Sequence, residues 1–304
     1  MFAILPLPKG RRIIAAALGT CRTQDCFTGS WLFDKQVIPM NPMLNIARQA
    51  ALNAGKIIVR GMNRLQRLQI TKKGRNDYVT EVDRLAEQEI IGTIRHSYPE
   101  HAFLAEESGQ SGESEFVWII DPLDGTTNYL HSFPVFAVSI ALQINGRLEC
   151  GLIYDVLRQE IFEASRGQGA QVDGHRIRVS KQAGMKGSLI GTGFPFRNNN
   201  RWLDEYMEML KAVIKSASGI RRPGAAALDL AYVAAGRLDG FWETGLSPWD
   251  MAAGAIIIKE AGGFVTDFSG DDNFLESGNI IAGTPKVYKE LMKTIHPYVG
   301  ALCK

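Results

Sequence analysis

The chain has 304 residues, of which 45% are hydrophobic and 22% are charged, so it can bury a substantial core. Its 34 Lys and Arg residues against 32 Asp and Glu residues leave a net charge of +2, which argues against a protein devoted to coating nucleic acid. The four cysteines match no zinc or redox spacing, and so predict reduced thiols and a cytoplasmic setting.

The first 39 residues differ from the rest, because they combine Pro6 and Pro8 with the basic segment 9–12 and the apolar stretch 13–19. That stretch is at the short limit for the apolar region of a signal peptide and far below the roughly 20 residues of a membrane span. We therefore expect no membrane segment. We interpret residues 1–39 as a disordered or non-native extension, such as an upstream start codon read in error would produce, and predict one domain over residues 40–304.

Two helices are predicted next in chain order. Asn41 is a good N-cap and Pro42 suits a first helical position, and apolar residues recur at helical spacing as far as Val59. A basic loop is expected to follow. The second helix begins after Thr80, with Asp83 three residues later as its capping-box partner.

The pattern then changes to strands. Residues 116–120 form a short apolar run of β-formers that stops at Asp121, which predicts a buried strand ending in a carboxylate. Ser247 and Pro248 begin a helix running to about residue 261, which places Asp250 in its first turn. The remaining expected elements are strands at 136–144, 151–154, 161–164, 188–191 and 239–243, and helices at 202–215 and 225–235. This mixture predicts a layered α/β fold whose halves, 40–185 and 186–304, pack as one unit.

The stretch after the first buried strand is the most informative for chemistry. Asp121 and Asp124 stand three residues apart, and with the carbonyl of Leu123 they offer the oxygen ligands that Mg²⁺ prefers. Gly125 and Thr126 offer backbone N–H groups at the start of a helical turn, which suits a phosphate. Taken alone, the pattern also fits an Asx-type turn after a strand.

Two further segments add carboxylates. Glu106 and Glu107 precede the strand, and Asp250 lies at a helix start downstream. Taken one by one, they fit a solvated acidic pair and a partner of the helix dipole. If four carboxylates converge, their repulsion is unfavourable unless cations neutralise it, which predicts two or three Mg²⁺ ions.

Four motifs, in order along the chain from about Met40 onward, resemble those of the inositol monophosphatase family. They are Glu106-Glu-Ser108, Asp121-Pro-Leu-Asp-Gly-Thr-Thr-Asn128, Gly224-Ala-Ala-Ala-Leu-Asp229 and Trp249-Asp-x-Ala-Ala-Gly254. Its bacterial SuhB branch is similar in further segments, namely 40–47, 73–80, 193–196 and 229–236. Ala225 departs from that branch, whose members tend to carry a hydroxyl residue there.

The resemblance implies an αβαβα sandwich and Mg²⁺-dependent hydrolysis of myo-inositol 1-phosphate or a similar polyol phosphate, with lithium sensitivity. It implies a first metal held by Glu106, Asp121 and the Leu123 carbonyl, and a second held by Asp121, Asp124 and Asp250. Glu106 would also contact a weaker third ion and take part in catalysis.

The resemblance also implies roles for residues around the metals. Asp83 and Thr126 match the pair that orients and deprotonates the attacking water. Phosphate would lie against Gly125, Thr126 and Thr127, and the substrate against Ala226, Glu243 and Asp250. No nucleophile loop of another phosphatase class is present, and the five histidines have no paired ligand spacing, so we interpret them as surface or structural and expect no zinc.

Two alternatives stay open. Related branches take a sugar bisphosphate or a nucleotide 3′-phosphate. The SuhB resemblance also implies a homodimer and association with RNA polymerase and the transcription antitermination machinery, with phosphatase activity secondary. A basic run that could contact RNA or an acidic partner, or be a solvated face beside a phosphate cleft, comprises Arg60, Arg64, Arg67, Lys72, Lys73 and Arg75.

Overall fold

The computed structural model describes residues 41–62, 70–74, 77–195 and 202–300, with the backbone alone for residues 70–79. All of these residues belong to one unit of the chain, Ile38–Lys304. The predicted extension at 1–39 lies outside the described residues, and so do Arg64, Arg67 and Arg75 of the basic run. The predicted domain boundaries therefore stay predictions.

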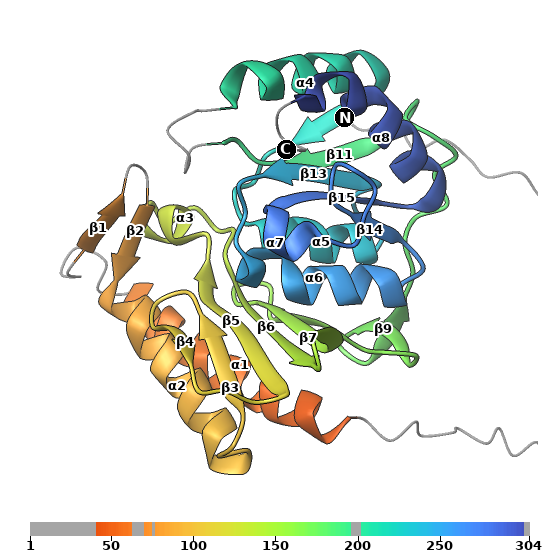
Figure 1. The fold of residues 1–304 in the computed structure, drawn as a ribbon. Helices are drawn as coiled ribbons and strands as arrows, with labels where there is room; N and C mark the ends of the chain where they lie inside the picture. The colour runs from red at the N-terminus through yellow and green to blue at the C-terminus, as the bar shows by residue number, and fades with distance from the viewer. Residues whose placement is uncertain (1–40, 63–69, 75–76, 196–201, 301–304) are drawn as a thin grey trace, which may run out of the picture. The chain divides into compact units, whose positions relative to one another are not determined.

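Helices are interspersed with runs of strands along the described chain (Figure 1). The helices are α1 Pro42–Met62, α2 Glu81–Ser97, α3 Thr126–Leu130, α4 Leu203–Ser216, α5 Ala226–Ala234, α6 Pro248–Glu260, α7 Phe274–Ser277 and α8 Pro285–Val299. The strands are β1 Ile70–Gly74, β2 Asp77–Thr80, β3 Ala102–Ala105, β4 Gly109–Ser111, β5 Phe116–Asp124, β6 Ala137–Ile144, β7 Arg147–Asp155, β8 Glu160–Ser165, β9 Gly169–Val172, β10 His175–Ile177, β11 Leu189–Thr192, β12 Gly219–Arg221, β13 Gly240–Thr244, β14 Phe264–Thr266 and β15 Asn279–Gly283.

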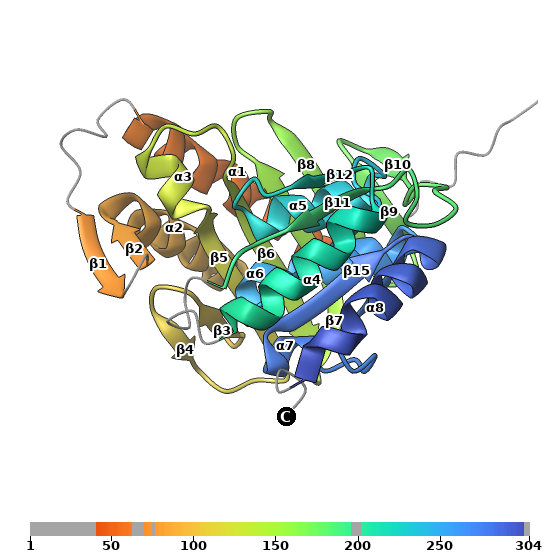
Figure 2. The same cartoon turned by 90° about the horizontal axis from the view of Figure 1, so that it is seen from above.

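Within the described residues, two larger sheets organise the fold. One has eight strands in the order β10-β9-β8-β7-β6-β5-β3-β4, and the other has five in the order β12-β11-β13-β15-β14. Helices α1 and α2 contact the first sheet, α5 and α6 contact strands of both sheets, and α8 contacts the second sheet and α4 (Figures 1 and 2). The layered α/β class predicted from the sequence is confirmed.

Three groups of buried apolar side chains fill the spaces between the layers. One joins α1 and α2 to the first sheet through residues such as Ile58, Ile90 and Trp118. The middle one surrounds α5 and α6, whose sides are nearly all buried, and the third joins α4 and α8 to the second sheet. Burial of α5 and α6 on all sides explains why their sequences lack the polar stripe of a surface helix.

The predicted helices and strands are found with boundaries within a few residues. Thr80 and Asp83 form the expected capping box of α2, and Ser247 and Asp250 form one at the start of α6. The prediction of a basic loop before α2 was wrong in part, because residues 70–74 and 77–80 pair as antiparallel strands β1 and β2. Their sequence carries few apolar residues, so hydrophobic periodicity gave no strand signal there.

Candidate active site

An irregularity in β5 brings two carboxylates to one place. Side chains three residues apart in a regular strand point to opposite faces of a sheet. Between Asp121 and Asp124, however, β5 has one residue more than its partner β6, because Asp121 pairs with Ser139 and Asp124 with Ala137. Pro122, which cannot donate a ladder hydrogen bond, lies in this bulge. The bulge allows both carboxylates to reach the same site.

A third carboxylate comes from the start of α6. Asp250 is held there by its capping box, in which the backbone N–H of Ser247 donates to Oδ2 over 2.7 Å. One carboxylate oxygen of each of Asp121, Asp124 and Asp250 lies within 4.8 Å of the other two. All three residues are buried. The structure thus brings Asp250 to two acidic residues that lie more than 120 positions before it in the chain.

Backbone N–H groups fix the two carboxylates of β5 as well. Leu123 donates to Oδ1 of Asp121 over 2.9 Å, and Ala227 at the start of α5 donates to Oδ2 of Asp124 over 2.8 Å. Each carboxylate therefore has its orientation fixed by a backbone hydrogen bond. Oxygen donors held in this way suit a hard divalent cation.

The electrostatics of the three carboxylates also favour a bound cation. Burial, and then the charges of Glu106, Asp124 and Asp250, raise the pKa of Asp121 well above its ordinary value. The cluster is therefore unfavourable in its fully ionised form unless positive charge is added. A bound divalent cation supplies that charge, so the donor set fits the metal that the sequence predicted.

A second polar group lies beside the cluster. Asp83 at the start of α2 is buried, and its Oδ2 accepts hydrogen bonds from the backbone N–H of Thr80 over 2.9 Å and from its hydroxyl group over 2.5 Å. The hydroxyl group of Thr126 donates to Oδ1 of Asp83 over 3.0 Å. Burial raises the pKa of Asp83, and the hydrogen bonds from Thr80 and Thr126 partly offset the effect.

These groups surround one pocket of about 510 Å³. The predicted site residues that line it are Glu106, Asp121, Leu123, Asp124, Gly125, Thr126, Thr127, Ala226, Glu243 and Asp250. Asp83 is not in the lining and reaches it through Thr126. Gly125 has a left-handed φ of +93°, and a Cβ there would stand 2.9 Å from the carbonyl oxygen of Val135, so the wall requires glycine.

The pocket also has a wall on which only Glu243 was given a predicted role. Asp229 of α5, Arg222 and Phe194 line it together with Glu243 of β13. The guanidinium carbon of Arg222 lies 5.1 Å from the centre of the Phe194 ring. His131, which we interpreted as surface or structural, also lines the pocket. Composition and spacing gave no signal for these residues, because they meet only through packing between the two sheets.

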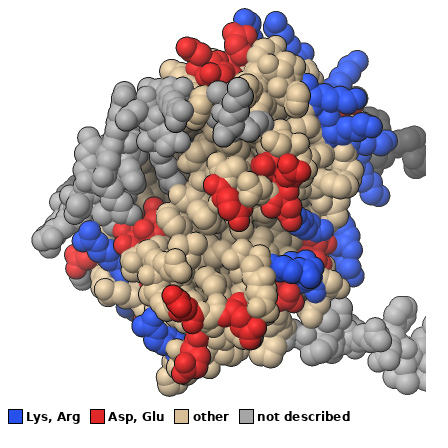
Figure 3. Space-filling model, viewed as in Figure 1, with Lys and Arg blue, Asp and Glu red and all other residues tan. Residues whose placement is uncertain are grey.

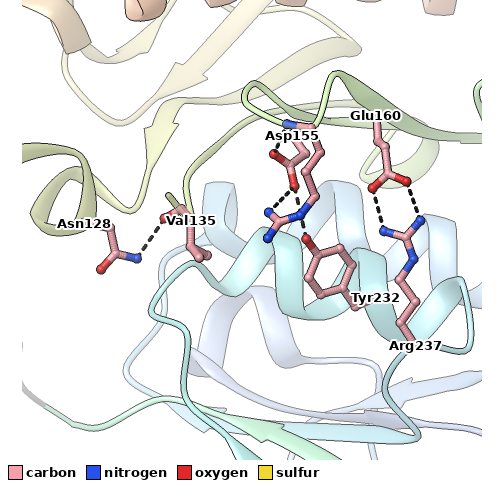
Figure 4. A network of polar contacts seen from close by, with 7 residues as sticks. Asn128, Val135, Asp155, Glu160, Tyr232 and Arg237 are labelled. Carbon is pink, nitrogen blue, oxygen red and sulfur yellow. Dashed lines mark hydrogen bonds and ion pairs between the residues drawn. The ribbon is translucent and has the colours of Figure 1, made fainter. Parts of the chain in front are cut away.

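Asn128 connects the two sides of the pocket. Its side-chain amide nitrogen lies 2.8 Å from the carbonyl oxygen of Val135 (Figure 4), 2.9 Å from that of Pro223 and 3.2 Å from that of Gly224. One amide group therefore ties the turn after β5 to the segment that leads into α5. Asn128 belongs to one of the motifs found in the sequence, but its role in connecting these two segments was not predicted.

The far end of α5 is tied to the first sheet by charged groups. The hydroxyl group of Tyr232 donates to Oδ2 of Asp155 over 3.1 Å, and Arg237 makes a two-pronged ion pair with Glu160 (Figure 4). Because the start of α5 supplies the N–H group that orients Asp124, these contacts help to fix the pocket. On the face drawn in Figure 3, basic side chains gather at the upper right, whereas acidic side chains lie at the centre and the bottom, with some basic ones beside them.

Comparison with known proteins decides the family. The model of the inositol monophosphatase family matches residues 40–299. The chain belongs to this family. The predicted resemblance, including its SuhB branch, is confirmed.

Similar proteins cover almost the same residues. The chain is 54% identical over 265 residues to the Nus factor SuhB of Pseudomonas aeruginosa, covering 86% of this chain and 98% of that protein. The crystal structure of the extragenic suppressor protein suhB from Bartonella henselae superposes with a TM-score of 0.81 at 45% identity, covering 84% and 98%. An inositol monophosphatase from Anabaena superposes with a TM-score of 0.75 at 39% identity, covering 84% and 95%.

Proposed function

We propose that the protein is a Mg²⁺-dependent phosphomonoesterase that hydrolyses myo-inositol 1-phosphate and similar polyol phosphates. The observation that carries the proposal is the group of three buried carboxylates, Asp121, Asp124 and Asp250, at the edge of a pocket large enough for a small phosphate ester. Membership of the inositol monophosphatase family supports it. No described helix is long and apolar enough to cross a membrane.

The proposed metal ligands are Asp121, Asp124 and Asp250, with Glu106 and the Leu123 carbonyl beside them. Mg²⁺, when bound, stabilises negative charge on the phosphate and on the leaving oxygen. The side chains keep their oxygens in place through hydrogen bonds from the backbone, so little reorganisation accompanies binding. Two or three ions per site are proposed, since one divalent charge does not neutralise four carboxylates.

Asp83 and Thr126 are proposed to handle the proton of the attacking water. The hydroxyl group of Thr126 donates to Oδ1 of Asp83, so its oxygen can accept a hydrogen bond from that water. Asp83, with its raised pKa, is a suitable base for the proton that Thr126 relays. Glu106 also lines the pocket and is proposed to assist in orienting the water.

The proposed substrate contacts lie on the remaining walls. Gly125, Thr126 and Thr127 would bind the phosphate oxygens, and Ala226, Glu243 and Asp250 would contact the leaving group. Glu243 is half-buried and can accept hydrogen bonds from hydroxyl groups. A polyol therefore suits the pocket better than an apolar alcohol.

A substrate panel tests the proposal. Purified protein with saturating Mg²⁺ should release phosphate from myo-inositol 1-phosphate faster than from fructose 1,6-bisphosphate or adenosine 3′,5′-bisphosphate. EDTA should abolish the release and added Mg²⁺ should restore it. A strong preference for either bisphosphate would replace the polyol assignment, and metal-independent turnover would refute the proposed metal site.

A second candidate function follows from the Pseudomonas relative, which is named a Nus factor. The chain would then associate with RNA polymerase during transcription antitermination, with phosphatase activity secondary. Copurification with RNA polymerase that survives Asp121→Asn would favour this role, and its absence from the native complex would exclude it. The predicted homodimer is tested separately, by light scattering after size-exclusion chromatography.

A further inference from the structure

A carboxyl group at the bottom of the pocket has no part in the proposed metal site. Asp229 lies in the first turn of α5 and is 1% exposed, yet it lines the pocket. Its Oδ1 is buried, and no described residue gives it a hydrogen bond. Buried polar atoms nearly always have a partner, so an oxygen without one inside a pocket points to a partner that arrives from outside.

Two glycines border this group and Glu243. A Cβ at Gly191 of β11 would lie 3.5 Å from Oδ1 of Asp229, and one at Gly193 would collide with the carboxyl group of Glu243. Gly191 belongs to β11 and Gly193 follows its last residue, so both carboxyl groups lie beside the carboxyl end of this strand. Leu238 and Phe241 close in on the Gly191 side, at 2.9 and 3.1 Å from the same Cβ position.

The charges near Asp229 favour a hydrogen-bonding partner without a negative charge. Burial, and then the charges of Glu243 and Asp124, raise the pKa of Asp229 well above its ordinary value, while Arg222 lowers it. A second phosphate group placed here would face Glu243 as well. A hydroxyl group meets no such repulsion, and it can donate to Oδ1 whether or not the carboxyl group is protonated.

We propose that Asp229 is a specificity-determining residue whose Oδ1 accepts a hydrogen bond from a hydroxyl group of the leaving group. The inference rests on the proposed function, since it assigns a residue to the substrate of that reaction. It extends the hydroxyl-binding wall from Glu243 to α5 and selects esters whose alcohol carries further hydroxyl groups. Asp229 has no role in binding the metals or the phosphate.

The test compares two esters and two variants in saturating Mg²⁺. myo-Inositol 1-phosphate has further hydroxyl groups in its leaving group, and phenyl phosphate has none. Asp229→Ala removes the acceptor without adding volume, and Ala suits a helix rich in alanine. Asp229→Asn keeps a carbonyl oxygen of the same size. Asp204→Asn, in the exposed first turn of α4, is the matched control for loss of a helix-start carboxylate.

For Asp229→Ala we expect kcat/KM for myo-inositol 1-phosphate to fall about 10- to 100-fold, and kcat/KM for phenyl phosphate to fall less than about threefold. Asp229→Asn should stay within about threefold of the unchanged protein on both esters. The thermal midpoint of Asp229→Ala should not fall, because no hydrogen bond to Oδ1 is lost in the free protein.

For Asp229→Ala, equal losses on both esters, or no loss on either, would overturn the role of Asp229. If Asp229→Ala does not fold, Asp229→Leu, which removes the acceptor at a similar side-chain size, takes its place: a loss on myo-inositol 1-phosphate alone supports the inference, and equal losses or no loss contradict it. Failure of the proposed function is a separate result. In that case the unchanged protein hydrolyses neither ester with Mg²⁺.

Discussion

The carboxyl groups at the two ends of the pocket differ in their hydrogen bonding. At the metal end, Asp121, Asp124 and Asp250 each accept a backbone hydrogen bond, so their orientation is fixed before any ligand binds. At the other end, Oδ1 of Asp229 is equally buried but has no such donor among the described residues. On our proposal, the metal end is preorganised for charge, whereas the other end is completed by the substrate.

The largest expected effect comes from removing a charge at the preorganised end. Asp121→Asn keeps the size of the side chain but removes the negative charge shared by both proposed metals. We expect kcat/KM with Mg²⁺ to fall about 10³-fold or more, equivalent to roughly 4 kcal/mol of transition-state stabilisation. Phosphate release from myo-inositol 1-phosphate measures it. Asp204→Asn serves as the control, and near-normal turnover by Asp121→Asn would contradict the metal assignment.

The next effect tests the proton path. Thr126→Val keeps the shape of the side chain and removes the hydroxyl group that donates to Asp83. We expect kcat to fall about 100-fold, because general acid–base steps contribute on that order. Thr126→Ser restores the hydroxyl group and should recover most of kcat. A Val variant with unchanged kcat would show that this hydrogen bond has no catalytic part.

A smaller effect on stability and activity is expected at Asn128, which connects the two sides of the pocket. Asn128→Ala removes the donor shared by the carbonyl groups of Val135, Pro223 and Gly224. Leaving these acceptors unpaired should cost about 1–3 kcal/mol of unfolding free energy. We expect kcat/KM to fall about tenfold as the walls separate. Denaturant unfolding and steady-state kinetics measure the two effects, and unchanged stability would refute the connecting role.

The smallest effect concerns pH and the free energy of unfolding without metal. The folded-state pKa of Asp121 is raised, chiefly by burial, so the folded protein binds a proton that the unfolded chain has released. This contribution is fully present below the ordinary carboxyl pKa of 3.8 and is lost as pH rises through the raised value.

In EDTA, the contribution of Asp121 should therefore make the thermal midpoint higher at pH 5 than at pH 8. Added Mg²⁺ should raise the midpoint by a few degrees, and by more at pH 8, where the cation meets ionised carboxylates. Thermal unfolding at both pH values with and without Mg²⁺ provides the measurement. A metal effect that is larger at pH 5 would contradict the assignment of the cluster.

Local signals made much of the fold predictable. Thr80 with Asp83, and Ser247 with Pro248, are capping patterns read within four residues, and both mark helix starts in the structure. The strand ending at Asp121 was visible as an apolar run, but its continuation to Asp124 was not, since Pro122 interrupts the pattern and only pairing with β6 defines the bulge. Strands β1 and β2 were not predicted, because they are defined by their pairing with each other and not by a hydrophobic periodicity.

The candidate site was predictable only in part for the same reason. The residues that converge on the pocket were named from motifs, and carboxylates next to a strand end or helix start carry a recognisable pattern. Asp229 stood in one of those motifs without a role. Its burial, and the lack of a donor for Oδ1, depend on how α5 packs beneath β11, which no short window of sequence contains.

The central claim is that Asp121, Asp124 and Asp250 share divalent cations. A crystal soaked in Mn²⁺, whose anomalous scattering marks its position, tests this most directly. The account predicts at least one strong anomalous peak about 2.1 Å from oxygens of Asp121 and Asp124, with Asp250 beside it. A fully soaked crystal with no peak among these three carboxylates would contradict it.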